Sequence, residues 1–165
     1  MTCGQIKPVS QQAVKIDDNF WSPKLGTWHQ VTIFDSFDKF EKVGAFANFD
    51  KVAHRQAAEH IGDPWWDGLV YEMITAAADF LAFRPNFALE KRVDSYIERI
   101  AAAAAADPEG YINTAVTLSD IGYRWTNPAH PDDTRNDRFP HTIYNAGCLV
   151  EAGVHYYLAT GRRTS

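Results

Sequence analysis

The sequence has 165 residues, 45% of them hydrophobic and 13% aromatic, and this composition excludes a disordered chain. Its formal net charge of −5 offers no cationic surface to phosphates, so we expect no nucleic-acid partner. The most apolar stretch, 146–159, contains Glu151 and His155 and falls short of the ~20 residues that cross a bilayer, so we expect no membrane span. The two cysteines, Cys3 and Cys148, lie far apart without metal-site spacing, which predicts no metal or cofactor site in this chain. The compartment stays open.

Spacings of three and four between apolar residues dominate the chain, and this periodicity predicts an all-α fold. After an extended lead-in over residues 1–23, residues 24–165 are expected to form a segment of helical hairpins. The first helix is predicted to end around Gly44, and a second to open at Asn48, a good N-cap residue, and to end near Gly62. The apolar residues that predict the first helix are Leu25, Trp28, Ile33, Phe37 and Phe40.

The clearest helix is the third, which is predicted to begin near Trp66. Pro85 should end it, because proline disfavours a helical conformation in the residue before it. Asn86 should then cap a fourth helix, which runs through an alanine-rich segment until Asp107. The third and fourth helices are therefore expected to form a hairpin with a very short turn.

The stretch 107–140 is rich in proline and Asp/Asn, which predicts a long, largely irregular connection. The final helix, 141–160, is apolar nearly all round, so it should be buried on several sides and end at Gly161. Either the earlier helices surround it or a packing partner is missing, and we favour the missing partner. Unpaired helix faces would then favour self-association.

Trp66 and Asp67 are candidate carbohydrate-binding residues at the start of the third helix. They belong to the stretch 62–68, which holds two tryptophans and two aspartates. Aromatic rings offer apolar faces to the C–H groups of a sugar, and carboxylates accept hydrogen bonds from its hydroxyls. The alternative is structural, with an aspartate capping the helix and the tryptophans packed into the core.

Tyr111, Asn113 and His141 are three further candidates for substrate binding. Tyr111 and Asn113 lie in the stretch 109–114, which suits a binding loop on a helical scaffold, although a plain connector explains the pattern equally well. His141 opens the last helix, where an imidazole can bond a hydroxyl or be satisfied by local backbone groups. No residue of the chain is assigned a catalytic role.

Several phrases of the sequence occur together in an order and spacing that match one known family. They are Asn19-Phe20-Trp21-Ser22-Pro23, Val70-Tyr71-Glu72, Leu81-Ala82-Phe83-Arg84-Pro85-Asn86, Gly110-Tyr111-Ile112-Asn113-Thr114, His141-Thr142-Ile143-Tyr144, Val150-Glu151-Ala152-Gly153-Val154-His155-Tyr156 and Thr160-Gly161. The chain therefore resembles the β-L-arabinofuranosidases of glycoside hydrolase family 127 over nearly its whole length.

The resemblance implies an (α/α)₆ toroid, six helical hairpins closed into a ring, of which this chain would supply about the first two. It implies cleavage of terminal β-L-arabinofuranose with a zinc-bound cysteine nucleophile and a glutamate acid/base. Neither Cys3 nor Cys148 matches the family's adjacent-cysteine motif. We therefore expect zinc only in a full-length enzyme and no activity from this N-terminal segment alone.

The resemblance also bears on the candidate site residues. His141 matches a histidine expected to contact the sugar, and Asp67 and Asn113 are weaker candidates. Leu69 and Thr142 depart from the family's usual acidic residues, which leaves the exact sugar open.

Two other interpretations stay open from the sequence. One is a different helical-toroid sugar enzyme, such as an unsaturated-uronide hydrolase or an epimerase. The other is a non-catalytic helical domain that binds carbohydrate or protein.

Overall fold

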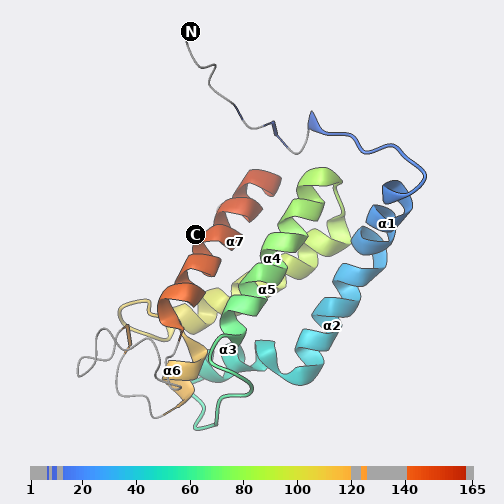
Figure 1. Ribbon diagram of the computed structural model, residues 1–165. Coiled ribbons are helices and arrows are strands. Elements are labelled where there is room, and N and C mark those ends of the chain that lie inside the picture. The colour runs from blue at the N-terminus through green and yellow to red at the C-terminus, as the bar shows by residue number, and fades with distance from the viewer. Residues whose placement is uncertain (1–6, 8, 11–12, 120–123, 126–140, 163–165) are drawn as a thin grey trace.

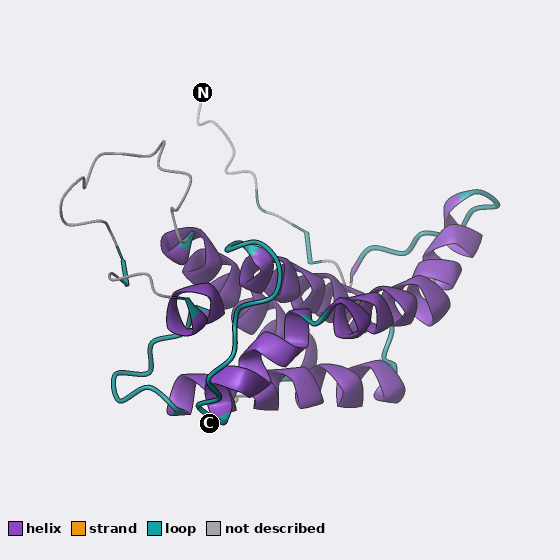
Figure 2. Ribbon diagram, turned by 90° about the horizontal axis from the view of Figure 1, so that it is seen from below, coloured by secondary structure: helices purple, strands orange, loops and turns teal. Residues whose placement is uncertain are grey.

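The computed structural model describes residues 7, 9–10, 13–119, 124–125 and 141–162. Within these ranges every regular element is a helix, as Figures 1 and 2 show, which confirms the predicted all-α fold. None of the described helices is long and apolar enough to cross a membrane.

The first three helical segments follow one another along one edge of the molecule (Figure 1). They are α1 (Trp21–Thr27), the π-helix η2 (Trp28–Thr32) and α2 (Ile33–Val43). Trp28 is 41% exposed, whereas its neighbour His29 is buried and places Nε2 2.9 Å from the carbonyl oxygen of Arg84. His29 therefore takes the buried position that the sequence pattern assigned to Trp28. The helix α2 ends at Gly44, as predicted, and Gly44 adopts the left-handed conformation.

The predicted limits of the second helix are wrong. The helix α3 (Ala45–Ala53) begins directly after Gly44 and ends well before Gly62. Asn48 is fully buried inside it rather than at its start, and its amide pairs with both backbone groups of Ile61 at 2.8 and 3.0 Å. Because an asparagine amide can either cap a helix or hold a returning loop, its residue type alone did not distinguish the two roles.

The third and fourth helices agree with their predicted start, stop and turn. They are α4 (Trp66–Phe83) and α5 (Phe87–Ala105), joined by three residues in which Arg84 is extended before Pro85. The Asn86 side chain accepts a hydrogen bond from the Leu89 amide at 3.1 Å and caps α5. In the described part of the stretch after α5 there is one short helix, α6 (Thr114–Leu118), which was not predicted.

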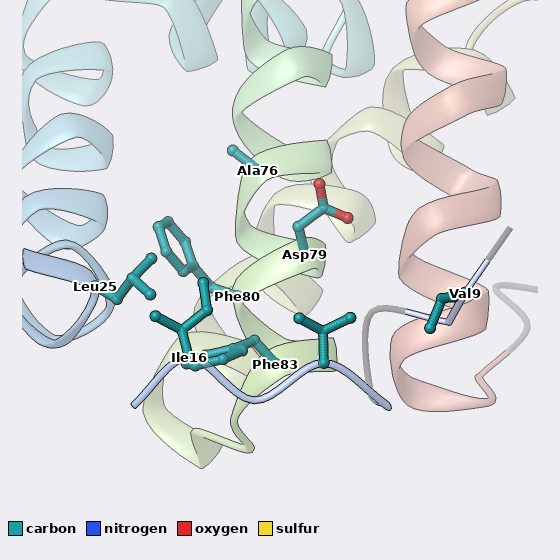
Figure 3. Close-up of a pocket in the computed structure, with 8 residues that line it drawn as sticks. Val9, Ile16, Leu25, Ala76, Asp79, Phe80 and Phe83 are labelled. Atoms are coloured by element: carbon teal, nitrogen blue, oxygen red, sulfur yellow. The ribbon is translucent and has the colours of Figure 1, made fainter. Parts of the chain in front are cut away.

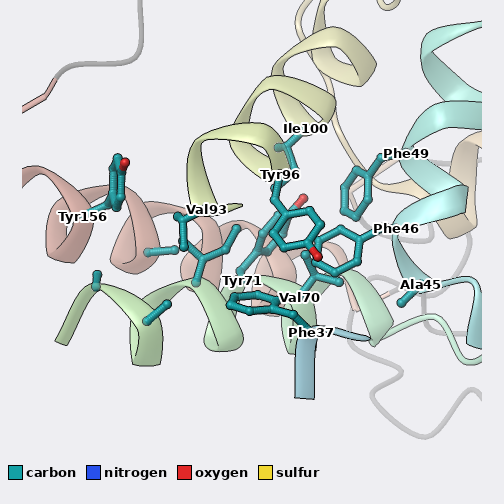
Figure 4. Packing of buried hydrophobic residues seen from close by; sticks show 14 of the residues in the cluster. Phe37, Ala45, Phe46, Phe49, Val70, Tyr71, Val93, Tyr96, Ile100 and Tyr156 are labelled. Carbon is teal, nitrogen blue, oxygen red and sulfur yellow. The ribbon is translucent and has the colours of Figure 1, made fainter. Parts of the chain in front are cut away.

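The hydrophobic core is built from α2, α3, α4, α5 and the buried face of the last helix, and Figure 4 shows its aromatic centre. The rings of Phe46 and Tyr96 are stacked with centroids 3.8 Å apart, and Phe37 lies beside both. All three side chains are at most 2% exposed. Aromatic rings therefore connect α5 to α2 and α3 inside the core.

The last helix, α7 (Thr142–Thr160), packs along α4 (Figure 1). One face of α7 is buried, but its other faces carry exposed apolar side chains, so the described helices do not surround it. The other alternative, a missing packing partner, stays a prediction. Gly161 ends the helix in the left-handed conformation, as predicted. The exposed residues are Ile143, Val150, Val154, Tyr157 and Leu158.

Candidate functional site

A buried carboxylate joins the first turn of α4 to the first residue of α6. Asp67 is 1% exposed and accepts two hydrogen bonds from Thr114, one from its amide at 2.7 Å and one from its hydroxyl at 2.6 Å. Trp65 occupies the N-cap position of α4, where no side chain caps the helix. Asp67 therefore fastens α6 to α4 instead of capping α4.

Two opposing effects act on the ionisation of the Asp67 carboxyl group. Burial raises its pKa to about 6, while the hydrogen bonds from Thr114 oppose that change. Tyr71, one turn further along α4, is also buried, and burial together with the Asp67 charge raises the pKa of its phenol. Asp67 thus lies in one of the least solvated parts of the described structure.

Asn113 and Tyr111 bring the loop before α6 to the start of α7. The Asn113 side-chain oxygen caps α6 by accepting from the Val116 amide at 3.0 Å, and its Nδ2 donates to Thr142 Oγ1 at 3.0 Å. The Tyr111 hydroxyl donates to the carbonyl oxygen of Arg124 at 2.7 Å and lies 3.3 Å from the same Thr142 oxygen. Burial raises the pKa of Tyr111. Both side chains hold the loop in place from its buried side.

Asn145 fixes the first turn of α7 against the first turn of α4. Its Oδ1 accepts from the Gly68 amide at 3.2 Å, and its Nδ2 donates to the Pro64 carbonyl oxygen at 3.0 Å. A Cβ at Gly68 would lie 2.6 Å from the ring of Tyr144 and 2.8 Å from Asn145 Oδ1. Only glycine therefore allows the two helices to approach this closely.

Four side chains at this junction form a partly exposed polar and aromatic surface, which we call the α4–α7 rim: Trp65, Glu72, His141 and Tyr144. The His141 ring makes an edge contact with Trp65, with centroids 5.2 Å apart, and a wider one with Tyr144 at 6.3 Å. The Tyr144 hydroxyl donates to Glu72 Oε1 at 2.7 Å, and this bond raises the pKa of the tyrosine. Trp65 and Tyr144 are 38% and 44% exposed, so the rim presents ring surface to solvent.

The structure separates the predicted site residues into two groups. His141 belongs to the rim, whereas Asp67, Asn113 and Tyr111 are buried behind it. Trp66 is half-buried and packs against the core, with its ring over Gly62, so its neighbour Trp65 is the tryptophan beside His141.

Sequence reasoning did not select Trp65, Glu72 or Tyr144 for the site. One signal was present, because Tyr144 follows His141 by three residues and therefore lies on the same side of α7. The proximity of Glu72 to His141 and Tyr144 depends on the packing of α4 on α7, which the sequence pattern does not reveal.

The described residues also line an apolar hollow at the C-terminal half of α4, and none of its lining residues belongs to the rim (Figure 3). Its volume is about 430 Å³, and Asp79 is the one acidic group in its lining. Ile16, Leu25, Phe80 and Phe83 supply most of the wall that Figure 3 labels.

The described residues contain no group of three or more His, Cys, Asp or Glu side chains that could hold a metal ion. Cys148, the cysteine in these ranges, is buried beside Glu72, and burial raises the pKa of its thiol. Cys3 lies outside the described residues. This part of the chain therefore does not offer the ligand set that a zinc site needs.

Comparisons with known proteins identify one family. The model of the β-L-arabinofuranosidase, GH127 catalytic domain, matches residues 13–165. A solved GH127 β-arabinofuranosidase is 34% identical with a TM-score of 0.77, over 94% of this chain and 24% of its own. A GH127 β-L-arabinofuranosidase from Geobacillus stearothermophilus T6 is 29% identical with a TM-score of 0.77, over 90% of this chain and 23% of its own. The chain thus spans about a quarter of each solved relative, and no curated protein matches.

Proposed function

Because the chain belongs to the GH127 β-L-arabinofuranosidase catalytic-domain family, we propose that it contributes the sugar-binding α4–α7 rim to an enzyme that hydrolyses β-L-arabinofuranosides. The observation that carries the proposal is the contact of the His141 ring with the exposed ring of Trp65. The family match favours this activity over that of a uronide hydrolase or an epimerase.

The chemistry of the rim suits a furanose ring. The Trp65 ring supplies a flat apolar surface for the C–H side of the sugar, and the His141 imidazole supplies a polar ring for a hydroxyl. Glu72 already accepts the hydroxyl hydrogen of Tyr144, and a carboxylate can accept further hydrogen bonds from a sugar. An aromatic surface beside hydrogen-bonding groups is what a small, hydroxyl-rich ligand requires.

The buried candidates have a supporting part in this proposal. Both carboxylate oxygens of Asp67 are occupied by Thr114, and Asn113 is engaged at both ends of its amide. Asp67, Asn113 and Tyr111 therefore shape the wall behind the rim, and Trp66 anchors the start of α4 to the core.

The proposal is limited to binding and assigns no bond-breaking step to this chain. The family resemblance implies zinc in a full-length enzyme, but the described residues do not fit a zinc site, so no step is derived through the metal. We expect the 165-residue chain to bind the sugar without hydrolysing it. Release of the phenol from an aryl β-L-arabinofuranoside by the pure chain, abolished by His141→Ala, would contradict this expectation.

Binding can be tested with methyl β-L-arabinofuranoside and saturation-transfer difference NMR. The unsubstituted chain should transfer saturation to the sugar protons, and Trp65→Ala and His141→Ala should each lose most of this signal. Trp28→Ala is a matched control, because Trp28 has a similar exposed fraction, 41% against 38%, but lies in η2. An equal signal from Trp65→Ala and Trp28→Ala would refute the rim as the binding surface.

A further inference from the structure

His141 has an unusual backbone conformation for a residue with a side chain. Its φ of 51° places it in the left-handed region, where it precedes the first residue of α7. This conformation is strained for a residue other than glycine, because its Cβ comes close to the following carbonyl oxygen. Such strain persists only where the surrounding structure holds the residue, and it often occurs at ligand-binding positions.

We propose that Asp67 and Thr142 are positioning residues for His141, with Thr114 and Asn113 connecting them. In this arrangement the buried hydrogen-bond network of these four residues fixes Thr142, the first residue of α7. Thr142 in turn fixes the backbone conformation of His141, which turns the imidazole toward Trp65. The proposal rests on the proposed function only for the role of His141 in binding the sugar. The positioning itself is a property of the chain without ligand.

The contacts run without interruption from α4 to α7. The Asp67 carboxylate holds Thr114 by two hydrogen bonds, and the adjacent Asn113 donates to Thr142 Oγ1 at 3.0 Å. Asp67, Asn113, Thr114 and Thr142 are each at most 1% exposed. A buried hydrogen-bonded chain of this kind resists displacement, because breaking one contact leaves an unpaired polar group away from water.

The hydrogen-bond network holds His141 through the residues that follow it in the sequence. Thr142 follows His141 directly, and the Asn145 amide donates to the His141 carbonyl oxygen at 2.8 Å. The Asn145 side chain is in turn fastened to Gly68 and Pro64 on the α4 side. The backbone that follows the His141 Cα is thus held both by the Thr142 hydroxyl and by the first turn of α7.

The donors and acceptors of this hydrogen-bond network determine which substitutions are informative. Thr114 offers two donors, and an ionised carboxylate accepts both, whereas an asparagine would turn its NH₂ group toward one of them. Thr142→Val keeps the shape of the side chain but removes the oxygen that accepts from Asn113. Thr142→Ser keeps the oxygen and removes only a methyl group.

The ring signals of His141 in two-dimensional NMR of the sugar-free chain report its position directly. Thr142→Val should shift the His141 ring signals, and Thr142→Ser should leave them near their original values. Asp67→Asn should shift them as well. Asp79→Asn is the matched control, because Asp79 lies on the same helix as Asp67, about 18 Å from it along the helix axis. Its carboxylate pairs with His155 and not with the network. Unchanged His141 signals in folded Thr142→Val would overturn the proposal, even where Asp67→Asn does not fold.

A second measurement separates this inference from the proposed function. If Thr142 acts through His141, Thr142→Val should weaken sugar binding in the unsubstituted chain and add no further loss in the His141→Ala chain. An additive loss in the double variant would overturn positioning through His141. Shifted His141 signals in a chain that binds no sugar would refute the proposed function alone.

Discussion

Replacing Asp67 with asparagine should remove a measurable part of the pH dependence of stability. Asp67 is fully buried, and burial raises its pKa to about 6 from an ordinary value of 3.8. The folded chain therefore binds this proton more tightly than the unfolded chain does. The resulting stability is fully present below pH 3.8 and is lost as the pH rises through 6. The pKa difference of about 2.2 corresponds to about 3 kcal/mol in all, at about 1.36 kcal/mol per pKa unit.

Urea unfolding followed by far-UV circular dichroism at two pH values measures this effect. About 2 kcal/mol of the change should fall between about pH 4.5 and about pH 7. The quantity to compare is the difference in the free energy of unfolding between the unsubstituted chain and Asp67→Asn. This difference should be about 2 kcal/mol larger at about pH 4.5 than at about pH 7. A difference that does not change with pH would refute the argument. A difference that is larger at the higher pH would mean that the hydrogen bonds from Thr114 outweigh burial.

Three further substitutions test the fold. Phe46→Ala should lower the free energy of unfolding by about 3–5 kcal/mol, since the ring is fully buried against Tyr96, and a loss below about 1 kcal/mol in urea unfolding would argue against this core. Gly62→Ala should destabilise by more than about 1 kcal/mol, because φ is 87° and the new Cβ would lie 2.2 Å from the Trp66 ring; an unchanged tryptophan emission spectrum and midpoint would disprove that contact. Asn86→Ala should cost about 1 kcal/mol through loss of the α5 cap, and an unaltered thermal midpoint would show that the cap contributes nothing.

The parts of the fold that the sequence predicted correctly depend on neighbouring residues. Gly44 ends a helix, Pro85 breaks one and Asn86 caps one through contacts within a few residues of each position. Asn48 was misassigned because its partner, Ile61, lies in the loop that follows α3, and residue type did not reveal that pairing. The short helix α6 depends partly on Asp67, 47 residues away, through Thr114.

The candidate site was predicted residue by residue, but its arrangement was not. His141 was selected as a sugar-binding residue, and the structure places it in the α4–α7 rim; Asp67 and Asn113 were selected without any indication that they lie behind the rim. Which of two adjacent tryptophans faces outward depends on Gly62 and on the packing of α7, both of which are set by tertiary structure. Sequence patterns therefore predicted the residue types of a candidate sugar site, and the packing of α4 on α7 determined which of them are exposed.

The most direct test of the account is a two-dimensional NMR titration of the isotope-labelled 165-residue chain with methyl β-L-arabinofuranoside. The account predicts that the largest shifts fall on the side chains of Trp65, His141 and Tyr144. Shifts confined to Phe80 and Phe83 in the apolar hollow, or no shifts at saturating sugar, would contradict it.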